Sequence, residues 1–105
     1  MTLSFFRDWA ECKSAEIQNS NISSEMISSE FIDSKIVHDP SSRVIHESQL
    51  CMGQIIVWKS QQLEMEVLHI ESEELIYWKY LEKIDSNLDE ITSDYFQVLR
   101  TGLKL

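Results

Sequence analysis

Short apolar runs separated by short polar breaks dominate the middle of the chain. The clearest runs are residues 53–59, 63–70 and 75–83, which are rich in β-branched and aromatic residues. A parallel crossover needs a dozen or more residues, so breaks this short join antiparallel neighbours. The pattern therefore predicts a three-stranded antiparallel meander over residues 53–83.

The segment before the meander is less regular. Residues 43–48 have the pattern of a short strand, and a turn at residues 38–42 precedes it, where Pro40 fixes φ and removes a backbone donor. Residues 22–37 are compatible with two structures. Their paired apolar residues recur at a helical spacing, whereas the β-branched residues and serines favour an irregular strand.

Two segments have the period of an amphipathic helix. The first runs from about residue 3 to residue 18, with Ser4 as a plausible N-cap. Its apolar positions are Phe5, Phe6, Trp9, Cys12 and Ala15. The second begins at the cap residue Asn87, with Glu90 placed as in a capping box, and ends before Gly102 at the C′ position. Its apolar stripe consists of Leu88, Ile91, Tyr95, Val98 and Leu99.

Each predicted helix has one apolar face to bury, and the sheet offers a surface on which to bury it. A twisted antiparallel sheet with both helices on the same face buries every stripe. We therefore expect an α+β fold: an antiparallel β-sheet of about five strands with N-terminal and C-terminal helices packed on one face. The length of 105 residues corresponds to one domain, residues 1–105.

Negative charge is concentrated in one part of the chain. Residues 61–95 contain ten carboxylates and two lysines, a net of −8, whereas the other residues contain eight acids and seven bases, a net of −1. Phosphate binding needs a basic face, so nucleic acid and anionic membranes are poor partners. A basic protein partner would be attracted, although the same charge could simply keep a small protein soluble.

The sequence carries no catalytic or metal-binding motif. Two glycines cannot form a loop that cradles phosphate. Four residues of types that bind metals could be imagined as one site, but their spacing matches no recognised ligand motif; they are His46, Cys51, His69 and Glu71. The adjacent pairs His38-Asp39 and His46-Glu47 would point to opposite faces of a strand, so neither is a ready dyad. We expect no enzyme, no metal and no cofactor.

Cys12 and Cys51 are interpreted as unpaired thiols in a reducing compartment, and as small buried hydrophobic groups. No apolar stretch is long enough to span a membrane. The N-terminus lacks the basic start and apolar run of a signal peptide. These features predict a cytoplasmic protein.

Four aromatic residues near the acidic stretch allow two interpretations; they are Trp58, Tyr77, Trp78 and Tyr80. As core residues they would fill a two-layer sandwich. As interface residues, one or two of them would protrude beside the carboxylates, as anchors in binding hot spots do. Tyr77 and Tyr80 point to opposite faces, so at least one of them should lie near solvent.

The meander also resembles a known family. Residues 53–58 form a glycine-led strand ending in Val-Trp, followed by an acidic Glu-Val-Leu strand and a Glu-Ser-Glu-Glu hairpin at residues 71–74. With an aromatic N-terminal helix, this pattern resembles the TriTu family of small bacterial immunity proteins over about residues 3–100. The chain departs from it at Ser72-Glu73, where Thr-Gly is expected and the glycine would accept a positive φ.

The resemblance implies a specific function. Such proteins are encoded beside the toxin domain of an Rhs-type effector delivered by type VI secretion. That domain resembles ADP-ribosyltransferases that use NAD to modify elongation factor Tu. The resemblance implies a 1:1 complex with the toxin domain in the cytoplasm, and no enzymatic activity in the immunity protein.

From the charge pattern we expect an acidic face that blocks the NAD or substrate cleft of the toxin domain. The expected toxin-binding residues are Glu64, Glu66, Glu71, Glu73 and Glu74, with Trp58 or Trp78 as an aromatic anchor. An adaptor or chaperone that escorts a secreted effector would also be small and acidic. An unknown enzyme is a third and weaker alternative.

Overall fold

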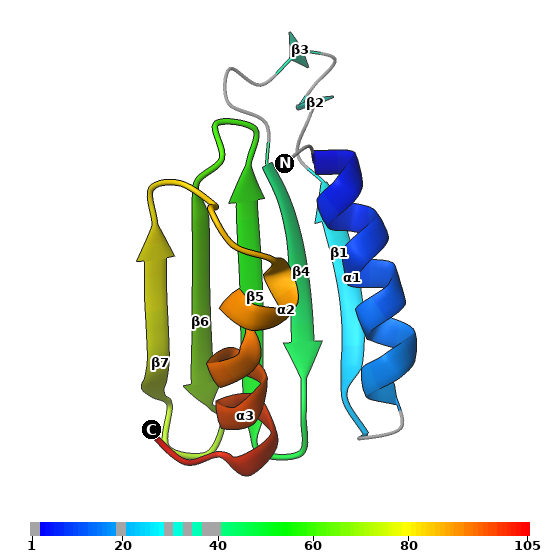
Figure 1. The fold of residues 1–105 in the computed structure, drawn as a ribbon. Coiled ribbons are helices and arrows are strands. Elements are labelled where there is room, and N and C mark those ends of the chain that lie inside the picture. The colour runs from blue at the N-terminus through cyan, green and yellow to red at the C-terminus, as the bar shows by residue number, and fades with distance from the viewer. Residues whose placement is uncertain (1–2, 19–20, 29–30, 33–34, 37–40) are drawn as a thin grey trace.

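The computed structural model describes residues 3–18, 21–28, 31–32, 35–36 and 41–105. A five-stranded antiparallel sheet forms one layer, and helices form the other (Figure 1). Along the sheet the strands are β1 (Ser23–Ser28), β4 (Ser41–Glu47), β5 (Cys51–Trp58), β6 (Leu63–His69) and β7 (Glu74–Leu81). The helices are α1 (Leu3–Ile17), α2 (Leu88–Ile91) and α3 (Ser93–Thr101).

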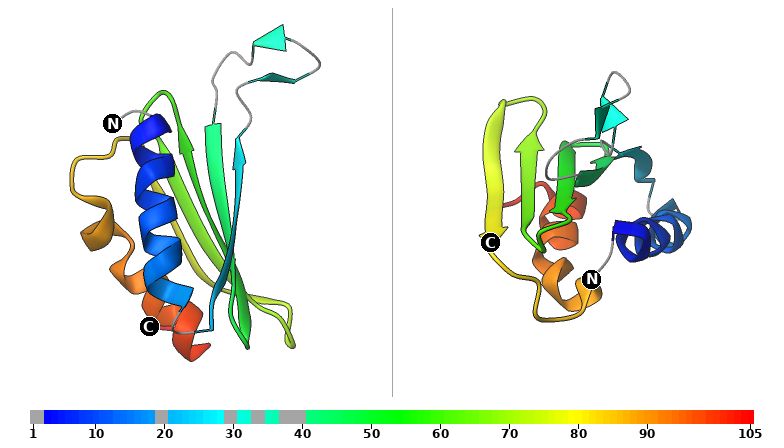
Figure 2. Two further views of the ribbon diagram at one scale, coloured as in Figure 1. Left: turned by 90° about the vertical axis from the view of Figure 1, so that its right-hand side faces the viewer. Right: turned by 90° about the horizontal axis from the view of Figure 1, so that it is seen from above.

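Figure 2 shows in side view that α1, α2 and α3 all lie on the same side of the sheet. No helix of the described part covers the opposite side. The expected α+β fold, with both terminal helical segments on one face, is therefore confirmed. The meander is also confirmed, because β5, β6 and β7 pair with their sequence neighbours in antiparallel register.

The irregular segment before the meander is extended where the structure describes it. β1 pairs with β4, and the short strands β2 (Phe31–Ile32) and β3 (Lys35–Ile36) form a separate two-stranded sheet. The helical alternative for residues 22–37 is therefore wrong over the described positions. The turn expected around Pro40 lies outside the described residues.

The buried face of α1 differs from the predicted stripe. Its buried residues are Leu3, Phe6, Ala10 and Ile17. Phe5, Cys12 and Ala15 are exposed, so the expectation that Cys12 is a buried hydrophobic group is wrong. The true stripe passes through Lys13, whose charge hid it in the sequence. The Lys13 ammonium lies 5.7 Å from the ring centre of Phe96 and its side chain is only 15% exposed, so a charged residue occupies part of the buried stripe.

The predicted C-terminal helix is divided into α2 and α3 at Thr92. The Thr92 hydroxyl donates a hydrogen bond of 2.6 Å to the carbonyl of Leu88 and is buried, which competes with regular helix geometry. Both predicted ends are confirmed. Asn87 caps α2 by accepting from the Glu90 N–H at 2.7 Å, and Gly102 ends α3 in the left-handed region at φ 70°.

A β-bulge in β7 changes which residues face the helices. Val67 is opposite Tyr77 and Leu68 is opposite Leu75, which leaves Ile76 as the extra residue. Ile76 and Tyr77 both pack against the core, and Leu75 is exposed. Strict alternation along residues 75–81 would place Ile76 with Trp78 and Leu75 with Tyr77, but it fails here because the bulge inserts one extra residue.

Candidate functional site

The side of the sheet opposite the helices is an extended surface that no further layer covers within the described part of the chain (Figure 2). Strand register aligns its outward side chains in three rows that cross all five strands. The rows are Ile27–Arg43–Ile56–Glu64–Tyr80, Glu25–Ile45–Gln54–Glu66–Trp78 and Ser23–Glu47–Met52–Leu68–Leu75. We call these fifteen residues the open face. Four carboxylates against the guanidinium of Arg43 give it a net charge of −3.

Large apolar side chains are exposed on the β5–β7 half of the open face. Trp78 is 56% exposed and Leu75 is 49% exposed. Met52, Leu68 and Tyr80 are exposed beside them. Single exposed apolar residues are ordinary, whereas a contiguous group of this kind marks an interaction surface.

Two carboxylates within this apolar group are held in place by neutral donors. The Gln54 Nε2 donates to Oε1 of Glu66 at 2.5 Å, and the Trp78 indole N–H donates to Oε2 of Glu64 at 3.3 Å. Glu66 is directly opposite Trp78, so the indole reaches diagonally to the next row. Hydrogen bonds to carboxylates orient them without neutralising their charge. The result is a preorganised negative site framed by aromatic rings.

A shallow hollow adjoins these carboxylates. Its lining is formed by Ile45, Met52, Gly53, Gln54, Glu66 and Leu68. All but Gly53 are open-face residues; Gly53 contributes only backbone to the hollow, because a side chain there would point to Tyr95 on the helix side. The hollow therefore offers an apolar recess with one carboxylate at its rim, which suits an apolar or basic side chain of a partner.

The structure separates the seven residues expected to bind the toxin. Glu64, Glu66 and Trp78 lie together on the open face, and Trp58 is half-buried at the end of β5. Glu71 and Glu73 are exposed in the β6–β7 turn, at one end of that face. Glu73 itself adopts φ 57°, so this turn keeps its left-handed residue without a glycine.

Glu74 points away from the open face. It is opposite His69 on β6 and forms an ion pair with Lys104 of the C-terminal segment. The hydrogen bond and positive charge of Lys104 lower the pKa of the Glu74 carboxyl. The pocket between them is lined also by Ile76 and Gly102, on the helix side of the sheet.

The acidic stretch of the sequence does not form a single surface. Asp89, Glu90 and Asp94 lie on α2 and α3, across the sheet from Glu64 and Glu66. The Trp9 indole donates to Asp89 at 3.1 Å and Lys13 lies 3.1 Å from it, and both lower the pKa of that carboxyl. Asp89 therefore fastens α2 to α1, while the open face keeps only part of the predicted charge.

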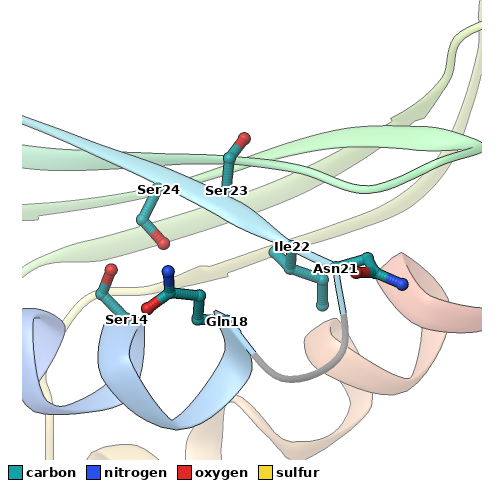
Figure 3. A pocket seen from close by; sticks show the side chains of 6 residues that line it. All are labelled: Ser14, Gln18, Asn21, Ile22, Ser23 and Ser24. Carbon is teal, nitrogen blue, oxygen red and sulfur yellow. The ribbon is translucent and has the colours of Figure 1, made fainter.

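A crevice between α1 and β1 is the other notable cavity (Figure 3). It is lined by Ser14, Gln18, Asn21, Ile22, Ser23 and Ser24. The side chains of Ser14, Gln18 and Ser24 converge in Figure 3. The Ser24 hydroxyl is buried and has no hydrogen-bond partner among the described residues. The lining has no carboxylate, imidazole, thiol or amine, so it has no group that could act as a general base.

His46, Cys51 and His69 have structural roles in the fold. His46 is buried, its Nδ1 lies 2.7 Å from the Tyr95 hydroxyl, and burial lowers its pKa to about 4. Burial also raises the pKa of the Cys51 thiol. His69 Nδ1 accepts from the Ser72 N–H in the β6–β7 turn. Over the described ranges, no three His, Cys, Asp or Glu residues gather as a metal site.

Comparison with known proteins decides the family. The family model described as "Immunity protein TriTu" matches residues 4–98. The chain belongs to the TriTu immunity protein family. Comparisons with curated proteins and with solved structures found no match. The resemblance inferred from residues 53–74 is thus confirmed, and with it the antitoxin role of the protein.

A TriTu immunity protein acts on a cognate toxin, so the open face is a candidate surface for binding that toxin. No helix within the described ranges is both long and apolar enough to cross a membrane. Sequence reasoning missed the contribution of Gln54 and Leu75 to this face, whereas Tyr80, one of the four aromatic candidates, is exposed there. Alternation along β5 could have indicated Gln54, whereas the bulge concealed Leu75.

Proposed function

We propose that this protein, as a single domain spanning residues 1–105, neutralises its cognate toxin domain by binding it 1:1 through the open face. The bound immunity protein covers the NAD or substrate cleft of the toxin. Following the family resemblance, the toxin is an ADP-ribosyltransferase domain of an Rhs-type effector that modifies elongation factor Tu. The complex forms in the cytoplasm of the producing cell and involves no catalysis by the immunity protein.

The observation that carries this proposal is the pair of oriented carboxylates within exposed apolar surface. Glu64 and Glu66 are fixed by Trp78 and Gln54, so little side-chain entropy remains to be lost when a cation approaches. Trp78 supplies an exposed aromatic anchor beside them on β7. A conventional interface of about 800 Å² per partner would extend over much of the sheet.

Electrostatics favours a basic target. A cleft that binds the phosphates of NAD has positive potential, and the open face together with Glu71 and Glu73 presents the opposite sign. Complementary potentials raise the association rate more than they raise affinity, and salt screens them. The turn carboxylates Glu71 and Glu73 extend the negative potential beyond the end of the sheet, whereas Glu74 contributes less because Lys104 neutralises it.

A double charge reversal tests this assignment. We expect Glu64→Lys with Glu66→Lys to slow association with the toxin domain by roughly tenfold or more at low salt, with a weaker effect at high salt. The matched control is Glu82→Lys with Asp85→Lys, which changes the net charge equally at exposed positions after β7. Stopped-flow or surface-based kinetics at several salt concentrations provides the measurement. Equal rates and equal salt dependence for both double variants would contradict binding through the open face.

A growth assay separates this function from that of a secretion adaptor. We expect coexpression of the protein with the toxin domain to restore growth at about one copy per toxin molecule. An adaptor would change export of the effector and leave its toxicity intact. Protection at far below one copy per toxin would instead indicate catalysis, and would contradict the stoichiometric mechanism.

A further inference from the structure

The two edges of the five-stranded sheet differ in character. β1 has polar and small residues at Ser23, Ser24 and Glu25, and α1 packs against it. β7 is longer and reads Glu-Leu-Ile-Tyr-Trp-Lys-Tyr-Leu, with Leu75, Trp78 and Tyr80 exposed. Natural proteins normally shorten, charge or cover an edge strand because a bare edge is a template for another strand. β7 has two such protections, the bulge at Ile76 and exposed Lys79, but beyond the bulge it is regular and exposes Trp78 and Tyr80.

The outer edge of β7 has no strand beside it in the described part of the chain. Figure 1 shows β7 at the margin of the sheet, and the view from above in Figure 2 shows the same arrangement. The C-terminal segment approaches only the beginning of the strand, where Lys104 meets Glu74. Alternate backbone N–H and C=O groups along β7 are therefore directed away from β6.

We propose that the toxin domain contributes an extended segment that pairs with β7 and becomes a sixth strand of this sheet. The inference rests on the proposed function, because the toxin is the partner. Strand addition supplies main-chain hydrogen bonds for affinity and leaves alternate side chains to provide specificity. Those side chains lie next to the row positions of Leu75, Trp78 and Tyr80 on the open face.

The surroundings of β7 define the chemistry of the added segment. Residues directly opposite Trp78 and Tyr80 should be apolar or aromatic, because such cross-strand pairs are favourable. Glu64 and Glu66 lie on β6, about 10 Å from the position of a sixth strand, which is two strand spacings. Lysine or arginine side chains on the added strand span that distance to the carboxylates. The open-face positions of the added segment are therefore apolar or basic, and they alternate with residues that face the helix side of the sheet.

A second copy of this chain is a poorer occupant of the edge. Each copy has a net charge of −9, and pairing β7 with β7 would bring two negative open faces into one continuous surface. Like charges at such an interface disfavour association, whereas a basic segment is attracted. The charge pattern thus selects a heterologous partner.

Amide hydrogen exchange resolved by residue tests the proposal. In the free protein, alternate amides of β7 should exchange fast because their N–H groups face solvent. We expect the same fast amides to slow at least about tenfold when the toxin domain encoded beside this protein is bound. Amides of β1 provide the internal control and should keep their free exchange rates.

A backbone-blocking substitution gives an independent readout. Of Lys79 and Tyr80, one directs its N–H away from β6, and exchange in the free protein identifies it. Proline at that position removes the outward donor while sparing the ladder to β6. We expect this Lys79→Pro or Tyr80→Pro variant to bind the toxin at least about tenfold more weakly than alanine at the same position. The alanine variant controls for the lost side chain, and an unchanged amide spectrum elsewhere controls for folding.

Each outcome decides a separate point. Protection of the fast β7 amides in the complex, with the loss of binding in the proline variant, supports strand addition. Unprotected β7 amides in a complex that still perturbs the open face overturn strand addition and leave the proposed function intact. Absence of any complex overturns both. Protection that rises with protein concentration without toxin identifies a second copy as the occupant and overturns the proposal.

Discussion

The hydroxyl of Tyr95 and Nδ1 of His46 are 2.7 Å apart in the core, where α3 packs on the sheet. Gly53 is the cross-strand partner of His46, and a side chain there would occupy the space of the Tyr95 hydroxyl. The glycine that begins the family-like strand pattern therefore has a packing role. It admits a large polar aromatic residue to the core and lets its hydroxyl reach a buried imidazole.

The first prediction concerns acid stability. His46 titrates at about 4 in the folded protein, below its ordinary value of 6.5, because burial disfavours the charged ring. Below pH 6.5 the unfolded chain binds a proton that the folded chain does not. Stability contributed by neutral His46 is therefore complete above pH 6.5 and is lost as pH falls towards 4. We expect a loss of about 3 kcal/mol over this range in urea unfolding.

The control for this prediction is His46→Gln, which keeps a polar group without titration. Its unfolding free energy should change less between pH 6.5 and 4.5 than that of the unsubstituted protein. The carboxyls of Asp89 and Glu74, whose pKa values are lowered, contribute at more acidic pH. Equal slopes for the two proteins above pH 4.5 would show that His46 does not carry the effect.

The second prediction tests the space at Gly53. A Cβ at this position would lie 2.5 Å from the Tyr95 hydroxyl oxygen, and the buried ring cannot move away freely. We expect Gly53→Ala to destabilise the fold by about 1–3 kcal/mol, as overpacking does. In a Tyr95→Phe background the closest contact is absent, so the same substitution should cost less. A double-mutant cycle by thermal unfolding measures the coupling, and strict additivity would contradict it.

The third prediction concerns the start of α2. Asn87 accepts the Glu90 N–H at 2.7 Å, so Asn87→Ala leaves that donor without its cap. We expect a loss of about 1 kcal/mol in unfolding free energy. Asn87→Asp keeps an acceptor at the positive end of the helix and should retain most of the stability. A loss in Asn87→Asp as large as in Asn87→Ala would indicate that the side chain acts otherwise.

The fourth prediction separates binding from folding. Trp78 is 56% exposed, whereas Phe6 is fully buried in the core between α1 and the sheet. We expect Trp78→Ala to change stability by less than about 1 kcal/mol and to weaken toxin binding by about 2 kcal/mol or more. Phe6→Ala should cost about 3–5 kcal/mol of stability. Calorimetric titration with the toxin domain, together with thermal unfolding, checks both. An unchanged affinity for Trp78→Ala would remove this residue from the interface.

Several elements could be predicted from the chain because their causes are local. Short polar breaks require antiparallel neighbours. Alternation along β5 places Ile55 and Val57 on one face of the sheet and Ile56 and Trp58 on the other. Asn87 and Gly102 are recognisable as helix ends because capping depends on the residues within one turn. These features depend on backbone geometry over a few residues.

The sequence could not indicate which separate elements lie beside one another in the folded protein. The acidic stretch is continuous in sequence, yet Asp89 lies across the sheet from Glu64 because α2 folds back over the opposite side. Lys13 concealed the buried stripe of α1 because only its packing against Phe96 shows that its stem is covered.

By itself, the sequence determined the antiparallel meander, both helical segments and the family of this protein, and left only residues 22–37 open between helix and strand. Tertiary structure decided which carboxylates lie beside Trp78, that His46 contacts Tyr95, and that β7 has no strand on its outer side among the described residues. The physical reason is the distance along the chain over which each interaction acts. Periodicity and caps act within one element, whereas neighbours across the sheet depend on register, one bulged residue and the path of the turns.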